Sequence, residues 1–182
     1  MMKRIILTLL LLFVFSSSQV SAEGKGEEAL LSITPIPIVE WTLPYAGILP
    51  DHPLYPIKQM RDKILLFVTR DPYKKVNIEL ILADKHLVMG SLLWERGSID
   101  LAEKTLAQGE KYLLMGISIL EAMEKDKDLP PGLIDKLKLA AKKHQEVLTR
   151  LMLAEKEVNN RQKLNEVLAT TNQAIQKITG LK

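Results

Sequence analysis

Cysteine is absent from the 182 residues of this chain, and only 5% of the residues are aromatic. Without cysteine the protein has no disulfide framework, no thiolate metal site and no cysteine nucleophile. It also has no cysteine that would carry the lipid of a bacterial lipoprotein. Because aromatic rings are so few, a stacking surface for nucleic-acid bases would depend on very few side chains.

An excess of charge of one sign is also missing. The chain has 25 Lys and Arg residues against 22 Asp and Glu residues. Two of the basic residues, Lys3 and Arg4, lie in an N-terminal leader, which leaves 23 basic against 22 acidic residues in the rest of the chain. Nucleic-acid binding needs a clustered excess of positive charge, so this balance predicts no nucleic-acid partner. The composition, 47% apolar and 26% charged, is typical of one soluble domain with short appendages.

Residues 1–22 have the three parts of a secretory signal peptide: a basic start, an apolar run over 5–15 and a small, polar stretch that ends in Val20-Ser21-Ala22. We expect cleavage before Glu23. The alternative is an uncleaved membrane anchor, but the apolar run has 11 residues, whereas a spanning helix needs about 20. The sequence therefore predicts an exported protein, periplasmic or extracellular, with no integral membrane segment after cleavage.

Residues 23–56 are expected to be non-helical. The first part is rich in glycine and charge, and six of the nine prolines lie between 33 and 56. Proline fixes its own φ and lacks an N–H, which excludes a helix or a central strand here. The segment also holds Ile, Val and Leu residues, Trp41 and Tyr45, which a flexible linker would avoid. We interpret it as an extended strap that lies on an apolar surface, either its own bundle or a partner.

Helical periodicity begins after the strap. Apolar residues recur at three- and four-residue steps over 56–69, 72–96, 99–125 and 133–158. Asp71-Pro72 is typical of a helix start, Ser98 is expected to cap the next helix, and Gly97 is expected to end the one before it. No alternating pattern is long enough for a sheet. The predicted fold class is all-α, a bundle of four or five long antiparallel helices over 57–182.

The apolar stripes identify the residues that share one face of each helix. In 56–69 they are Ile57, Met60, Ile64, Phe67 and Val68, and in 72–96 they are Tyr73, Val76, Leu80, Ala83, Leu87 and Trp94. In 99–125 they are Ile99, Ala102, Leu106, Gly109, Leu113, Gly116, Leu120 and Met123. In 133–158 they are Leu137, Ala140, His144, Val147, Leu151, Ala154 and Val158. Continuing the last stripe would place Arg161 and Asn165 on the apolar side, so it restarts as Leu164, Leu168, Thr171, Ile175 and Ile178. We expect a break at Asn159-Asn160, because asparagine favours turns and caps.

Glycine on the third stripe predicts close helix packing. Gly109 and Gly116 lie seven residues apart and face the same way, although each costs a helix about 1 kcal/mol relative to alanine. The expected neighbour is the preceding helix, whose Gly90 would lie across the hairpin. On this interpretation Gly116→Leu overpacks the contact, whereas Gly116→Ala is tolerated.

A resemblance to a known family begins at residues 49–56, which read Leu-Pro-Asp-His-Pro-Leu-Tyr-Pro. It continues through Asp71-Pro72, Lys74-Lys75, Leu82-Ala83-Asp84 and Glu95-Arg96-Gly97. Over roughly 45–150 the chain resembles a bacterial family of exported all-helical domains of unknown function. The resemblance implies a helical bundle behind a signal peptide or membrane anchor, and it brings no activity and no catalytic residues.

No residue pattern indicates an active site, a cofactor or a metal centre. His52, His86 and His144 are the natural metal candidates, but none has a second ligand three or four residues away on the same helical face. We therefore interpret His86 and His144 as partly buried or surface residues of ordinary helices. Ser118 falls within a helix, without the strand-turn-helix elbow of a nucleophilic serine. We predict no catalytic, cofactor-binding or metal-binding residues and no enzymatic activity.

The sequence leaves three functional classes open. We favour a non-catalytic interaction or scaffold protein of the bacterial cell envelope with an unknown partner. A sensor that binds a small ligand or metal inside the bundle is the alternative, and an envelope enzyme of unrecognised type is the third. Lys136, Lys138, Lys142 and Lys143 form a local basic surface that could contact an anionic partner, but lysines on a long helix more often serve solubility.

Overall fold

A computed structural model describes residues 36–125 and 129–181. The leader and the first part of the strap, residues 1–35, lie outside the described residues, so cleavage before Glu23 stays a prediction. The chain divides into two units at residue 35, and all described residues belong to the second unit.

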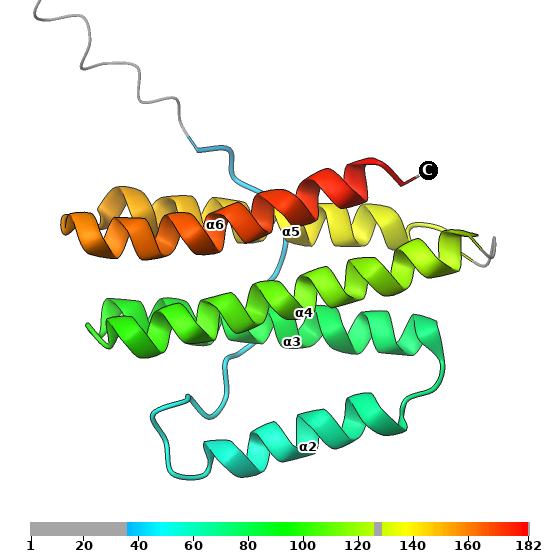
Figure 1. The fold of residues 1–182 in the computed structure, drawn as a ribbon, viewed down its shortest axis with the longest axis horizontal. Helices are drawn as coiled ribbons and strands as arrows, with labels where there is room; N and C mark the ends of the chain where they lie inside the picture. Colours follow the sequence, from blue (N-terminus) through cyan, green and yellow to red (C-terminus); the bar gives the residue numbers. More distant parts are fainter. Residues whose placement is uncertain (1–35, 126–128, 182) are drawn as a thin grey trace, which may run out of the picture. The chain divides into compact units, whose positions relative to one another are not determined.

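Five helices and no strand occur in the described part of the chain (Figure 1). They are α2 (Tyr55–Val68), α3 (Pro72–Glu95), α4 (Ile99–Lys125), α5 (Leu133–Ala154) and α6 (Val158–Thr179). The pairs α3/α4 and α5/α6 form two hairpins, and α4 contacts α6 between them. The backbone of α2 approaches only α3 among the helices. The predicted all-α class is confirmed.

Local sequence signals explain where α3 begins and ends. The Asp71 carboxylate accepts a hydrogen bond from the backbone N–H of Lys74 at 2.9 Å, and Pro72 occupies the first helical position, where its missing N–H costs nothing. Gly97 follows the helix with a φ of +80°, a left-handed conformation that glycine adopts without strain. The predicted bounds of this helix are confirmed to within one residue.

Two apolar clusters fill the bundle of α3 to α6. One cluster contains Val76, Leu80, Ala83, Leu113, Ile117, Leu120, Met123, Leu133, Leu137, Ala140, Ala141, Ala174 and Ile178. The other contains Leu87, Leu93, Trp94, Ala102, Leu106, Leu148, Leu164 and Val167. Between the two clusters each helix has at least one buried polar residue, and α3 and α5 each have a second one, His86 and Glu146. The first of these residues on each helix is Asp84 on α3, Glu110 on α4, His144 on α5 and Thr171 on α6. We call these four residues the polar layer.

The predicted glycine contact between α3 and α4 is confirmed. A Cβ on Gly109 would lie 3.0 Å from the Cβ of His86, and a Cβ on Gly116 would lie 3.4 Å from the Cβ of Glu79, both on α3. Gly90 of α3 faces Leu106 of α4 in the same way. The absence of side chains at these positions lets the two helix backbones approach closely.

The break between the last two helices lies earlier than predicted. α5 ends at Ala154 and α6 begins at Val158, so Asn159 and Asn160 belong to the first turn of α6. The Glu155 carboxylate accepts hydrogen bonds from the backbone N–H groups of Lys156 and Glu157, so these contacts lie in the turn between the two helices, before the asparagines. Val158 is consequently 76% exposed and is not part of the α5 stripe, where it was wrongly placed.

Two further side chains depart from the predicted stripes. Tyr73 is 44% exposed, because it lies in the first turn of α3, and Ala154 is exposed at the end of α5. By contrast, α3 is buried beyond its predicted stripe, and Glu79, Leu82, Asp84, His86 and Met89 are all buried. This helix has neighbours on several sides, α2, α4 and α5, so a single apolar stripe underestimates its contacts.

Candidate functional site

The most unusual surface of the described chain is on α2. The predicted apolar stripe does share one face, but that face points away from the bundle. Its side chains are 60% exposed at Ile57, 58% at Met60, 53% at Ile64, 88% at Phe67 and 60% at Val68. We call these five residues the outer face of α2. The only buried residue of this helix is an aspartate, Asp62.

Polar side chains form the inner side of α2. The Tyr55 hydroxyl lies 3.3 Å from Nε2 of His86 on α3, and Nδ1 of His86 lies 2.8 Å from the carbonyl oxygen of Leu82. Because a carbonyl only accepts, Nδ1 carries the proton and Nε2 accepts from Tyr55. Burial lowers the pKa of His86 and so favours this neutral ring.

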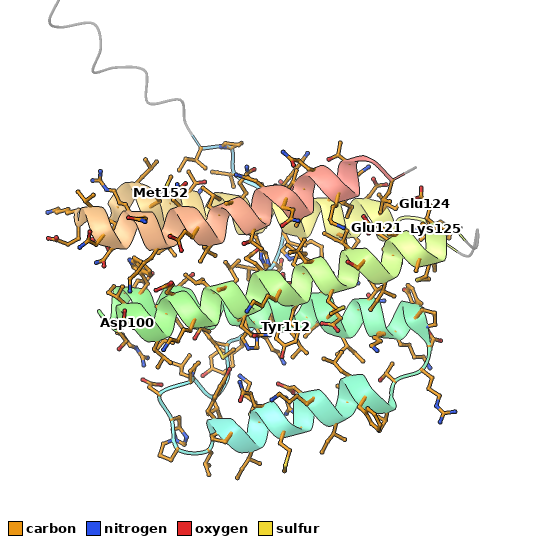
Figure 2. All side chains as sticks on the ribbon, viewed as in Figure 1. Asp100, Tyr112, Glu121, Glu124, Lys125 and Met152 are labelled. Carbon is orange, nitrogen blue, oxygen red and sulfur yellow. The ribbon has the colours of Figure 1, made fainter. Side chains whose placement is uncertain are left out.

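Tyr112 extends this polar contact to α4. It projects from α4 toward the side on which α2 lies (Figure 2), and its ring centroid is 5.0 Å from that of His86. Burial and the nearby charge of Glu79 raise the pKa of Tyr112, so its hydroxyl stays protonated. Asp62 of α2 pairs with its neighbour Arg61, whose Nη2 is 2.6 Å from Oδ1. The inner side of α2 therefore contacts α3 through the hydrogen bond from Tyr55 to His86, whereas the Arg61–Asp62 pair lies within α2 itself.

The polar layer contains a buried ion triad. His144 is fully buried, and its Nδ1 lies 2.8 Å from Glu110 Oε1 while its Nε2 lies 3.0 Å from Asp84 Oδ1. Burial alone would lower the pKa of the ring, but the carboxylates of Glu110 and Asp84 outweigh it and raise this pKa to about 9. The ring is thus an imidazolium at neutral pH that donates one hydrogen bond to each carboxylate.

This triad does not form a metal site. The two ring nitrogens of His144 donate in different directions, so Asp84 and Glu110 lie on separate sides of the ring and do not surround one point. Within the described residues no group of three or more His, Asp or Glu side chains is arranged to hold a metal ion. The full burial of His144 and the 3% exposure of His86 correct the interpretation that either could be a surface residue.

Segment 36–54 binds its own bundle at the polar layer and at α5. The indole Nε1 of Trp41 donates to Asp84 Oδ2 at 3.1 Å. The backbone N–H of Val39 donates to Glu146 Oε2 at 2.6 Å, and Lys143 Nζ donates to the same carboxylate at 3.1 Å. Burial opposes ionisation of Glu146, but these donors prevail and lower its pKa.

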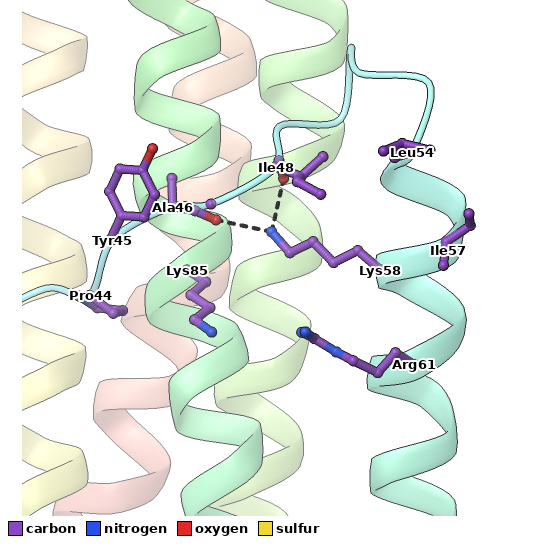
Figure 3. Close-up of a pocket in the computed structure, with 10 residues that line it drawn as sticks. Pro44, Tyr45, Ala46, Ile48, Leu54, Ile57, Lys58, Arg61 and Lys85 are labelled. Carbon is purple, nitrogen blue, oxygen red and sulfur yellow. Dashed lines mark hydrogen bonds between the residues drawn. The ribbon is translucent and has the colours of Figure 1, made fainter.

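A pocket of about 650 Å³ lies between this segment and α2 (Figure 3). Residues 44–48 line one side, Leu54, Ile57, Lys58 and Arg61 line the other, and Lys85 of α3 closes the base. Lys58 Nζ donates to the carbonyl oxygens of Ala46 at 3.0 Å and Ile48 at 2.9 Å, as Figure 3 shows. The pocket therefore offers apolar side chains and cations, with no carboxylate, thiol or hydroxyl nucleophile among its lining residues except the Tyr45 phenol.

The other residues considered from sequence are not brought together. His52 accepts a hydrogen bond from the backbone N–H of Leu54 on an exposed turn, and the Ser118 hydroxyl donates to the carbonyl of Leu114 in its own helix. Of the four lysines on α5, Lys136 bonds the side chain of Asn77, while Lys143 bonds Glu146. Two members of the predicted basic surface are thus already engaged within the protein.

Sequence reasoning missed Asp84 and Glu110 as partners of His144. The signal that could have found them is their place beside the predicted stripes, since Asp84 follows Ala83 and Glu110 follows Gly109. His144 itself was correctly placed in the buried stripe of α5, and a buried histidine needs a partner for each ring nitrogen.

Glu79 is another buried carboxyl group that sequence reasoning did not identify. It is 3% exposed, and its Oε2 has no hydrogen-bond partner among residues 36–125 and 129–181. Burial raises its pKa to about 7, and the charge of Lys75 offsets only part of this effect. Near neutral pH this group is therefore partly protonated.

Comparison with known proteins gives a family without an activity. Residues 47–174 match the family described as a domain of unknown function, DUF5667, and the chain belongs to this family. The match begins at Gly47 and runs through α2, α3, α4 and α5 into α6. No curated protein and no solved structure matches the chain. Across the described ranges, none of the helices has the length and hydrophobicity that a membrane crossing requires.

Proposed function

We propose that this protein is a non-catalytic interaction module of the bacterial cell envelope, exported by its leader to the periplasm or the cell exterior. The observation that carries the proposal is the outer face of α2. A helix of a soluble domain normally turns its apolar side toward the core. Here the polar side is turned inward and five large apolar side chains face outward, an arrangement typical of a surface that another molecule covers.

The remaining features agree with an interaction role. The buried His144 is used in contacts with Asp84 and Glu110 on two other helices and is closed off from solvent. The sensor alternative requires a ligand inside the bundle, whereas the pocket of about 650 Å³ lies between segment 36–54 and α2, outside the two apolar clusters. The pocket thus favours the α2 side of the molecule as the functional side.

A binding experiment with envelope fractions tests this proposal. The purified protein is incubated with envelopes of the producing cells and recovered with whatever it binds. The test variant is Ile64→Gln/Phe67→Gln, and the matched control is Met115→Gln, which changes a side chain 53% exposed on α4. We expect the wild type and the control to associate with the envelope fraction and the test variant to lose the association. Equal association of all three proteins, or none by any of them, contradicts the proposal.

A further inference from the structure

We propose that α2 docks the protein on the surface of an anionic lipid bilayer, with its outer face in the acyl boundary and the basic residues around it among the head groups. The proposal rests on the interaction function above and names its partner. Three observations support the lipid proposal: the exposed side chains of α2, the positions of the charges around them and the contacts that hold the helix in place.

Basic residues flank the outer face on both sides. At about 100° per residue, Arg61 lies about 60° to one side of Ile64 and Lys63 about 100° to the other. Asp62, the only acidic residue of α2, is turned inward and buried. An apolar stripe bordered by cations is the arrangement that places a helix in the plane of a lipid interface.

Positive charge is concentrated at this part of an otherwise nearly neutral chain. Residues 57–75 contain six basic residues, Lys58, Arg61, Lys63, Arg70, Lys74 and Lys75, against the two acidic residues Asp62 and Asp71. Of the 23 basic and 22 acidic residues in 23–182, this leaves 17 basic against 20 acidic residues elsewhere. The side chains of Lys63 and Arg70 form no ion pair with any described residue, so their charges are available to an anionic surface.

The same charges disfavour a second copy of this chain as the occupant. Two outer faces packed against each other would bring two positively charged borders together, and like charges at an interface oppose binding. A lipid surface with anionic head groups supplies the complementary sign along the whole length of the helix.

The helix is already formed and tethered before it meets a membrane. Tyr55 bonds His86, and Lys58 bonds the carbonyl groups of Ala46 and Ile48, all on the side away from the outer face. Isolated amphipathic peptides must fold on the membrane, and that ordering opposes binding. Because α2 is held by its inner side, binding does not require the helix to form.

A fluorescent probe on α2 gives the direct test. Since the chain has no cysteine, Met60→Cys provides one labelling site on the outer face, and Met115→Cys on α4 provides a matched control of similar exposure. Each protein is the chain from Glu23 to Lys182, without the leader; it carries an environment-sensitive fluorophore and is mixed with vesicles of phosphatidylcholine alone or with added phosphatidylglycerol. We expect a blue shift and a rise in emission only for the α2 probe and only with the anionic vesicles.

Charge and apolar variants then test the two parts of the interaction. In the Met60→Cys background, Lys63→Gln/Arg70→Gln should raise the lipid concentration at half-maximal response about 25-fold, because each cation near an anionic surface contributes a factor of about five. Phe67→Gln should raise it about tenfold or more through the loss of apolar burial. Lys142→Gln on α5 is the charge control and should leave the response unchanged. Circular dichroism of each variant verifies that the fold is retained.

The other outcomes have distinct meanings. No response of the α2 probe to anionic vesicles overturns the lipid proposal, and an equal response to both vesicle types overturns its anionic specificity. A response to rising protein concentration without lipid identifies a second copy as the occupant. If the probe responds to envelope protein but not to lipid, the interaction function stands and the lipid proposal fails. If it responds to neither, both fail.

Discussion

Replacing His144 by glutamine tests the buried ion triad most directly. The change removes the imidazolium and leaves the carboxylates of Asp84 and Glu110 facing a neutral amide inside the bundle. Removing one partner of a buried charge cluster costs about 3–5 kcal/mol, because the remaining charges lose their compensation without regaining solvent. We expect His144→Gln to lower the free energy of unfolding by this amount at neutral pH.

The pH dependence of the free energy of unfolding gives a second, independent value for the stabilisation by His144. In the unfolded chain the ring titrates near 6.5, whereas in the folded protein its pKa is raised to about 9. The stabilisation by the protonated ring is therefore complete below pH 6.5 and is lost as the pH rises through 9. The gap between these values corresponds to about 3 kcal/mol. The stability difference between wild type and His144→Gln should shrink by about this amount across the interval.

Urea unfolding followed by circular dichroism at a series of pH values between about 6 and about 10 measures both effects. The double variant His144→Gln/Glu110→Gln is the control, because it removes one of the two carboxylates and should recover part of the lost stability at neutral pH. A difference between wild type and His144→Gln that stays constant over the whole pH range would refute a charged histidine. A loss well below 1 kcal/mol at neutral pH would refute the triad as a structural contact.

Three further predictions concern single sites. Gly90→Ala should lower the free energy of unfolding by about 1–3 kcal/mol, because the new Cβ would lie 2.5 Å from Cγ of Leu106. Gly116→Ala should leave it unchanged or raise it by up to about 1 kcal/mol. Thermal melts distinguish the two variants, and equal melting temperatures would contradict a close helix contact at Gly90. Between pH 4.5 and pH 7 the free energy of unfolding of the wild type should fall by about 3 kcal/mol relative to Glu79→Gln, because the raised pKa of Glu79 makes its ionisation unfavourable in the folded state. If the free energies of unfolding of the two proteins changed in parallel with pH, this prediction would be wrong. N-terminal sequencing of the native protein should begin at Glu23, and a retained Met1 would show that the leader is not removed.

The bounds of α3 and the apolar stripe of α4 were predictable because they depend on neighbours in sequence. Asp71 and Gly97 act on backbone groups within five positions of themselves, and the three- and four-residue spacing from Ala102 to Met123 reports directly on one buried face. The position of the break after α5 was missed for a related reason. Asparagine has the stronger general preference for turns, but here the carboxylate of Glu155 accepts the backbone hydrogen bonds of the turn.

The orientation of α2 and the ion triad could not be predicted in this way. An amphipathic pattern identifies a face without saying which side of the helix the bundle occupies, and the polar inner side of α2 finds its partner in His86, 31 positions after Tyr55. In the triad, Asp84 and Glu110 lie 60 and 34 positions before His144. Contacts at such separations are set by the tertiary packing of four helices, so single-helix periodicity contains no information about them.

The hydrogen bond from Val39 to Glu146 joins positions 107 residues apart, and this separation predicts an order in which the structure is completed. Helical hairpins such as α3/α4 close through contacts near in sequence and form early, whereas the closure of a long loop has to wait until both of its ends have a surface to meet. We therefore expect segment 36–54 to dock last, after α5 has joined α3 and α4. We expect the same segment to leave first when the protein opens locally, and the emission of Trp41 to change before the helices melt.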